Sequence, residues 1–117
     1  MATDFRSGTD FPRRGRDEFG GYLWLRRVYD KARAAAAGTI HDYIYPCPMD
    51  KGVFERWGIT SEQFDAALAA HATDESILAW LNERVRPGGR EKANRWVGVE
   101  KASNLDRQDS EEGGVAA

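Results

Sequence analysis

The strongest constraint on the fold of this chain is the periodic spacing of apolar residues between positions 22 and 37. Apolar side chains recur there every three or four residues, as they do on one face of an α-helix. They are Tyr22, Leu25, Val28, Tyr29, Ala32 and Ala36. Gly38 follows at a position where helices commonly end in a left-handed residue. The spacing therefore predicts a long amphipathic helix that ends at Ala37.

Further helices are indicated by residues that commonly start or end a helix. Asp50 is suited to cap the start of a short helix that stops at Gly58. Thr60 and Gln63 have the spacing of a capping box, and Thr73 is suited to cap the next helix. We expect helices over residues 50–57, 61–71, 74–86 and 91–102.

A chain of 117 residues is expected to form one domain, and its 41% hydrophobic and 31% charged residues are typical of a globular protein. The helical pattern predicts a mostly all-α fold, a compact single-domain bundle of about five helices. An extended loop rich in tyrosine and proline is expected after the first long helix, because Pro46 and Pro48 disfavour a helix there. We expect an extended basic arm over residues 1–19, the helical domain over 20–102, and an acidic, disordered tail over 103–117.

The charge balance and the lack of long apolar runs limit the class of protein. A formal net charge of −2 argues against general nucleic-acid binding. A helix-turn-helix around Ala72 is disfavoured because residues 60–86 contain five acidic and only two basic side chains. No secretory or membrane-spanning segment is evident. The single cysteine, Cys47, fits a reducing compartment, so we expect a cytoplasmic protein.

Six short segments spread along the chain form a combined pattern. They are GGYLWL (20–25), DKAR (30–33), WGI (57–59), TDE (73–75), ILAW (77–80) and NLDRQD (104–109). Together they resemble a bacterial family of unknown function, domain of unknown function 5069. The resemblance implies a compact bacterial helical domain, and it supplies no reaction, cofactor or catalytic residue.

The densest group of polar and aromatic side chains lies in the loop after the first long helix. It comprises His41, Asp42, Tyr43, Tyr45, Cys47 and Asp50. In an extended segment, alternation places the odd-numbered residues from His41 to Cys47 on one face, as a wall of hydrogen-bonding groups with one thiol. Tyr43, Tyr45 and Asp50 are therefore binding candidates. Alternatively, the tyrosine rings pack on the core and only their hydroxyls reach the surface.

Cys47 is the candidate nucleophile, with His41 or His71 as its base. A nucleophilic thiol needs an activating group, and Cys47 lies between Pro46 and Pro48 rather than at a helix start. A helix that begins near Asp50 would still bring amide dipoles within a few residues. The alternative is a small buried thiol. Two histidines and one cysteine lack the paired spacing of a zinc site, so we predict no metal site and no cofactor.

A second candidate site combines Gly20 and Gly21, before the first long helix, with Arg13, Arg14 and Arg16. Glycines let the backbone approach a ligand closely, and free amides at a helix start favour negative charge. The three arginines are suited to close over a phosphate or a carboxylate. The alternative is a flexible turn beside solvated arginines.

Together these features favour a non-catalytic binding or protein-interaction module, whose partner is an unknown protein or a small anionic ligand. Polar and aromatic residues converge in the loop without a recognisable set of acid, base and nucleophile. The alternative is a small enzyme or thiol-dependent redox protein that uses Cys47 with His41 and the nearby tyrosines. The sequence indicates no particular oligomeric state.

Overall fold

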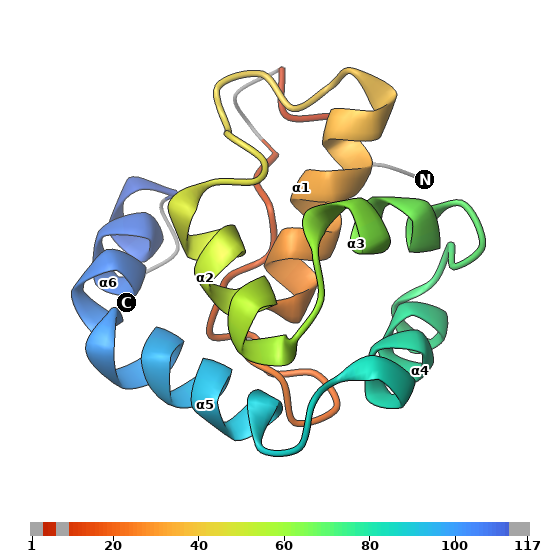
Figure 1. Ribbon diagram of the computed structural model, residues 1–117. Coiled ribbons are helices and arrows are strands. Elements are labelled where there is room, and N and C mark those ends of the chain that lie inside the picture. Colours follow the sequence, from red (N-terminus) through yellow and green to blue (C-terminus); the bar gives the residue numbers. More distant parts are fainter. Residues whose placement is uncertain (1–3, 7–9, 113–117) are drawn as a thin grey trace.

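Helices dominate the computed structural model of the protein, which describes residues 4–6 and 10–112 (Figure 1). They are α1 (Leu25–Ala37), α2 (Pro48–Trp57), α3 (Ser61–Leu68), α4 (Asp74–Arg84), α5 (Gly89–Arg95), the π-helix η1 (Trp96–Glu100) and α6 (Ala102–Glu111). Within the described ranges, β-structure is limited to an isolated bridge between Phe19 and Tyr22. The predicted, mostly all-α fold is confirmed, and the helix expected over 91–102 is present as α5 followed by η1. No helix among the described residues is long and apolar enough to cross a membrane.

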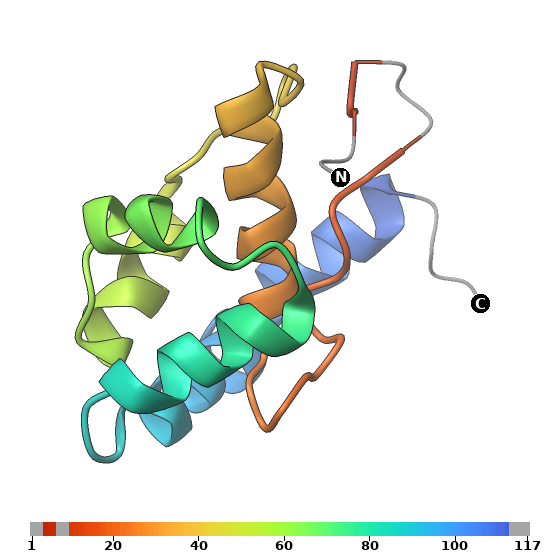
Figure 2. The same ribbon diagram turned by 90° about the vertical axis from the view of Figure 1, so that its right-hand side faces the viewer.

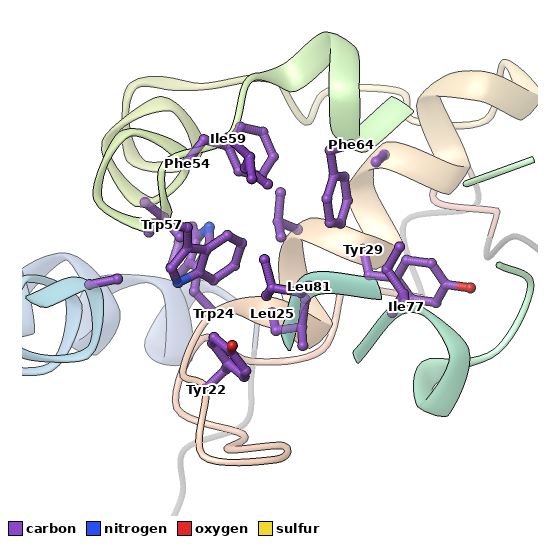
Figure 3. Close-up of a cluster of buried hydrophobic side chains, with 14 of the residues drawn as sticks. Tyr22, Trp24, Leu25, Tyr29, Phe54, Trp57, Ile59, Phe64, Ile77 and Leu81 are labelled. Carbon is purple, nitrogen blue, oxygen red and sulfur yellow. The ribbon is translucent and has the colours of Figure 1, made fainter. Parts of the chain in front are cut away.

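Aromatic side chains from α2, α3 and the start of α1 fill the centre of the fold (Figure 3). Trp24, Trp57 and Phe64 are fully buried. The ring of Phe54 lies 5.9 Å from that of Trp57 and 5.2 Å from that of Phe64, between centroids. Burial of each such side chain stabilises the fold by roughly 1.5–3 kcal/mol. This packing holds α1 against α2 and α3, and α1 carries several of the charged residues described below.

The chain enters α1 through a tight turn at Gly20–Gly21. The two glycines have φ of 60° and 86°, and Phe19 and Tyr22 exchange backbone hydrogen bonds of 2.9 and 3.0 Å across them. A two-residue turn with positive φ at both central positions strongly favours glycine. Trp24 also has a positive φ, of 73°, so the first helical residue is Leu25, not the first apolar position of the sequence pattern.

Most of the predicted helix caps are confirmed. The hydroxyl of Thr60 accepts a hydrogen bond from the amide of Gln63 at 3.1 Å, and the side chain of Gln63 accepts one from the amide of Thr60 at 2.9 Å. Thr73 caps α4 in the same way through its hydroxyl. Gly38 and Gly58 end α1 and α2 in the left-handed conformation. These contacts span a few residues each, which is why the local sequence predicts them.

The start of α2 differs from the prediction, because Cys47 and not Asp50 is its cap. The amide of Asp50 donates to Sγ of Cys47 at 3.5 Å, and the Asp50 carboxylate accepts from the amide of Cys47 at 3.0 Å. Pro48 occupies the first helical position. A backbone N–H there would have no acceptor within the helix, so its absence in proline costs no hydrogen bond. The cap was assigned to the wrong residue because aspartate is a common cap and cysteine is not.

The segment after residue 103, which we expected to be disordered, instead forms helix α6. Its Leu105 is buried and packs beside Gly15, where an added Cβ would lie 2.9 Å from the leucine side chain. Its acidic residues meet the basic arm: Arg16 forms an ion pair of 2.7 Å with Asp106. In Figure 2 the arm runs between α1 and α6. The expectation was wrong because this pairing joins residues 90 positions apart; the end of the predicted tail, residues 113–117, lies outside the described residues.

Candidate binding cleft

A cleft of about 640 Å³ lies between the arm, the loop that joins α1 to α2, and α6. Its apolar lining comes from the arm, the loop and the start of α2, and consists of Phe5, Phe11, Tyr43, Ile44 and Met49. Its charged lining includes two buried residues of α1, Arg27 and Lys31, and Glu112 just after α6. We call this space the arm cleft. It joins apolar surface to buried charge, as small-molecule sites commonly do.

The rim of the arm cleft exposes large apolar side chains. Phe11 is 38% exposed and Ile44 is 68% exposed, and both line the cleft. Among the described residues, Val99 is the only other large apolar side chain with comparable exposure. Two such side chains at one cleft form a patch that a ligand can cover, whereas a single exposed apolar residue needs no explanation.

Three side chains from separate segments hold the carboxylate of Glu112. Arg27 of α1 donates two parallel hydrogen bonds, of 3.0 and 2.7 Å, to its two oxygens. Tyr43 of the loop donates one of 3.2 Å, and Nε of Arg14 in the arm lies 3.4 Å from the same carboxylate. Paired bonds from one guanidinium are the strongest common way to hold a carboxylate. We call Arg14, Arg27 and Tyr43 the carboxylate seat.

The phenol of Tyr43 is held in its protonated form. Burial, followed by the neighbouring negative charge of Glu112, raises the pKa of Tyr43 to about 12. Its ring packs edge to face on the buried Phe5, with centroids 5.3 Å apart. Tyr43 therefore acts as a hydrogen-bond donor to a carboxylate at any physiological pH.

A buried group of polar side chains surrounds Cys47 at the floor of the arm cleft. Nζ of Lys31 lies 3.3 Å from Sγ of Cys47 and 2.8 Å from the carboxylate of Asp50. The thiol also caps α2, so the expectation that it lies away from a helix start is wrong. Asp50 is fully buried, and its role is to hold this group together rather than to face a ligand. Within the described ranges, no three His, Cys, Asp or Glu side chains are arranged to hold a metal ion.

The loop does not place its four predicted residues on one face. His41, Tyr43 and Cys47 line the arm cleft, whereas Tyr45 lines a separate groove between α1 and α3 and donates a 2.6 Å hydrogen bond to Asp65. Burial, followed by this hydrogen bond, raises the pKa of Tyr45. Simple alternation fails because the loop contains turns and His41 has a left-handed φ of 55°. The imidazole is half exposed, and its Nε2 lies 3.3 Å from Asp42.

Each of the three arm arginines contacts carboxylates of the folded chain. Nη2 of Arg13 lies 2.9 Å from Asp30 and 2.8 Å from Asp74. Its hydrogen bond to Asp74 is the main reason why the pKa of Arg13 is raised. Arg14 and Arg16 both contact Asp109 of α6. Their charges are therefore used to fasten the arm to α1, α4 and α6.

The turn at Gly20–Gly21 lies against different neighbours from these arginines. A Cβ added at Gly20 would meet the side chain of Leu78 in α4, and one at Gly21 would meet Arg90 in α5. The α1 helix starts at Leu25, so its first amides do not directly follow the glycines. The structure thus does not bring the two glycines and the three arginines together, and the arginines that contact the carboxylate of Glu112 are Arg14 and Arg27.

Sequence reasoning missed the buried charged residues of the arm cleft, which are Arg27, Lys31 and Glu112. A signal for the first two was present, because they lie four residues apart beside the apolar stripe of α1 and therefore on a flank that a second element can cover. Glu112 had no such signal. Its partner Arg27 lies 85 residues earlier, and only the folded chain brings them together.

The comparisons with known proteins agree with the resemblance in the sequence. The family model described as Domain of unknown function (DUF5069) matches residues 9–115. The match covers the arm from Asp10 onward and every helix that borders the arm cleft. No curated protein gives a match. The chain therefore belongs to the family of domain of unknown function 5069.

Proposed function

We propose that this protein is a non-catalytic binding module whose arm cleft takes a small organic ligand. The observation that carries the proposal is that Phe11 and Ile44 are both exposed on the lining of a cleft that also contains buried Arg27 and Glu112. Clefts of roughly 300–1,000 Å³ with apolar walls and a few placed polar groups are typical ligand sites. The volume of the arm cleft lies within this range.

The test uses a neutral aromatic probe, 4-phenylbutanamide, titrated into the protein and followed by amide chemical shifts. We expect shifts at residues around Tyr43 and Ile44, and about fivefold weaker binding in Ile44→Ser because a contact of about 1 kcal/mol is lost. Val99→Ser is the matched control, since Val99 is 67% exposed and Ile44 is 68% exposed. Equal weakening by both substitutions, or no shifts at the cleft, would overturn the proposal.

A second candidate function, thiol chemistry at Cys47, is favoured by one observation. Lys31 places a buried ammonium 3.3 Å from Sγ, and the thiol caps the start of α2. Positive charge and a helix start are the surroundings in which cysteines become reactive. A cytoplasmic location, which we propose because Cys47 is the single cysteine, would keep it reduced.

This second candidate is tested by the rate at which iodoacetamide alkylates Cys47 at neutral pH. A rate well above that of N-acetylcysteine under the same conditions supports thiol chemistry. A slower rate in the folded protein excludes it and leaves the binding module as the function. Alkylation of the urea-unfolded chain serves as the control that the thiol is intact.

A further inference from the structure

The contacts of Glu112 resemble those of a bound ligand more than those of a surface ion pair. Its carboxylate receives two bonds from Arg27 and one from Tyr43, and it lies beside Arg14. These donors come from α1, the loop and the arm, so no single element supplies the site. Arg27 itself is only 3% exposed, which removes water as a competitor for its guanidinium.

The arm cleft also has hydrogen-bonding capacity that the described chain leaves unused. Nε of Arg27 and Oε1 of Gln108 are both buried and have no hydrogen-bond partner among the described residues. Both residues line the arm cleft. Buried polar atoms in folded proteins are nearly always paired, so an unpaired donor and an unpaired acceptor at one cleft point to a ligand with polar atoms of its own.

Glu112 is positioned so that it can leave the carboxylate seat. It is the residue after the last turn of α6, and the helix itself is anchored by the buried Leu105 and by the ion pairs of Arg16. Withdrawal of one side chain at the helix end therefore leaves these anchors in place. The vacated seat would open directly into the arm cleft, which Glu112 lines.

The charges around the cleft restrict what can replace Glu112. Besides the positive Arg27, Lys31 and Arg107, the cleft is lined by Asp10, Asp42 and Glu111. These acidic groups repel a multiply charged anion, whereas a single carboxylate can take the two bonds of Arg27 and the one of Tyr43. The exposed Phe11 and Ile44 are then available to the rest of the ligand.

We infer that the arm cleft binds a small monocarboxylic acid with an apolar body, and that Glu112 occupies the carboxylate seat as a built-in competitor until the acid displaces it. This inference rests on the proposed function of the cleft and adds the chemical class of its ligand. It also assigns a regulatory role to Glu112, because the strength of its own contacts sets how tightly the acid binds.

The experiment compares 4-phenylbutyrate with the neutral 4-phenylbutanamide by calorimetry and amide chemical shifts. In Glu112→Gln, which keeps the side-chain volume and removes the competing charge, phenylbutyrate should bind about tenfold tighter, while the amide changes by less than about twofold. Glu111→Gln is the matched control: it removes the same charge one residue away, outside the seat, and should give only a small gain. In the Glu112→Gln background, where the competing charge is gone, Tyr43→Phe should weaken phenylbutyrate and leave the amide unchanged.

The outcomes separate the two proposals. If the amide binds but Glu112→Gln gives no tighter binding of phenylbutyrate than Glu111→Gln, the seat is refuted and the binding module stands. If neither probe binds at the cleft of any variant, both proposals fall. If Glu112→Gln loses the amide signals of α6, Glu112→Asp replaces it, because the shorter side chain keeps the charge at the helix end but holds the seat less well. Equal affinity of wild type and Glu112→Asp for phenylbutyrate then overturns the inference.

Discussion

The indole Nε1 of Trp24 donates a hydrogen bond of 2.8 Å to the carboxylate of Asp50, and both side chains are fully buried. Trp24 precedes α1 and Asp50 lies in the first turn of α2, so this bond joins the starts of the two helices. Asp50 also accepts hydrogen bonds from Lys31 and from the amide of Cys47. One carboxylate thus accepts hydrogen bonds from three donors that lie in different parts of the chain.

Asp50→Ala should therefore be strongly destabilising. It leaves the ammonium of Lys31 buried without its counter-charge, a change that typically costs about 3–5 kcal/mol. Asp42→Ala is the control, because the side chain of Asp42 is 89% exposed and its loss should change stability by less than about 0.5 kcal/mol. Urea unfolding followed by tryptophan fluorescence measures both. Similar costs for the two substitutions would contradict the buried network.

Gly52→Ala should destabilise the protein, although alanine normally stabilises a helix interior by about 0.5–1 kcal/mol relative to glycine. The added Cβ in α2 would overlap the ring of Trp96. This ring is packed against two cations: Cζ of Arg56 lies 4.1 Å and Nζ of Lys101 lies 5.5 Å from a ring centroid of Trp96. We expect a loss of about 1–3 kcal/mol in the free energy of unfolding.

The same substitution in a Trp96→Ala background provides the internal control. With the ring removed, only the helix preference remains, and Gly52→Ala should then stabilise α2. If Gly52→Ala stabilises the protein in the wild-type background, the ring of Trp96 does not obstruct a Cβ at position 52. Thermal and urea unfolding of the four proteins give the comparison.

The contribution of Asp74 to stability should depend on pH. The hydrogen bond from Arg13 lowers the pKa of Asp74 below its ordinary value of 3.8. A carboxyl whose pKa is lower in the folded than in the unfolded state stabilises the fold above its ordinary pKa, and this contribution is lost as the pH falls through the folded value. Asp74→Asn should thus be less stable than wild type at neutral pH, and the difference should shrink below pH 3.8.

Glu75→Gln is the matched control for this pH dependence, because Glu75 also lies in the first turn of α4 and shares its helix-dipole effect. Urea midpoints measured from neutral to acidic pH should show a larger and more strongly pH-dependent difference for Asp74→Asn. Parallel curves for the two variants would indicate that the helix start, and not Arg13, accounts for the effect.

Leu105→Ala should loosen α6 before it loosens the rest of the protein. Leu105 is the one buried side chain within α6, and removal of a buried leucine typically costs about 2–5 kcal/mol. Hydrogen exchange should accelerate at α6 amides while α1 amides keep their protection. Ser103→Ala, at an exposed position of the same helix, should leave the exchange pattern unchanged. Uniformly faster exchange in every helix would contradict a locally anchored α6.

Helix boundaries could be predicted where their signals are local. Thr60, Thr73, Gly38 and Gly58 each contact backbone groups within a few residues, so the sequence alone identifies them. The start of α2 was missed because Cys47 is an uncommon cap. Cys47 is effective as a cap because the carboxylate of Asp50 accepts a second hydrogen bond, from the amide of Cys47.

The candidate site was only partly predictable. Tyr43, His41 and Cys47 were singled out and do line one cleft, but the charged residues behind them were not. Arg27 and Lys31 were not singled out, because a helix pattern shows which side is apolar and not which flank another segment will cover.

The sequence by itself determined the helices, most of their caps and the glycine turn before α1, since each depends on contacts between near neighbours. Only the tertiary structure decided that α6 is ordered and that the arm cleft exists. The pairs that build them, such as Arg27 with Glu112 and Arg16 with Asp106, join residues 85 and 90 positions apart. Charges of both signs are frequent along the chain, and their partners are selected only when packing of the aromatic core brings the arm, α1 and α6 together.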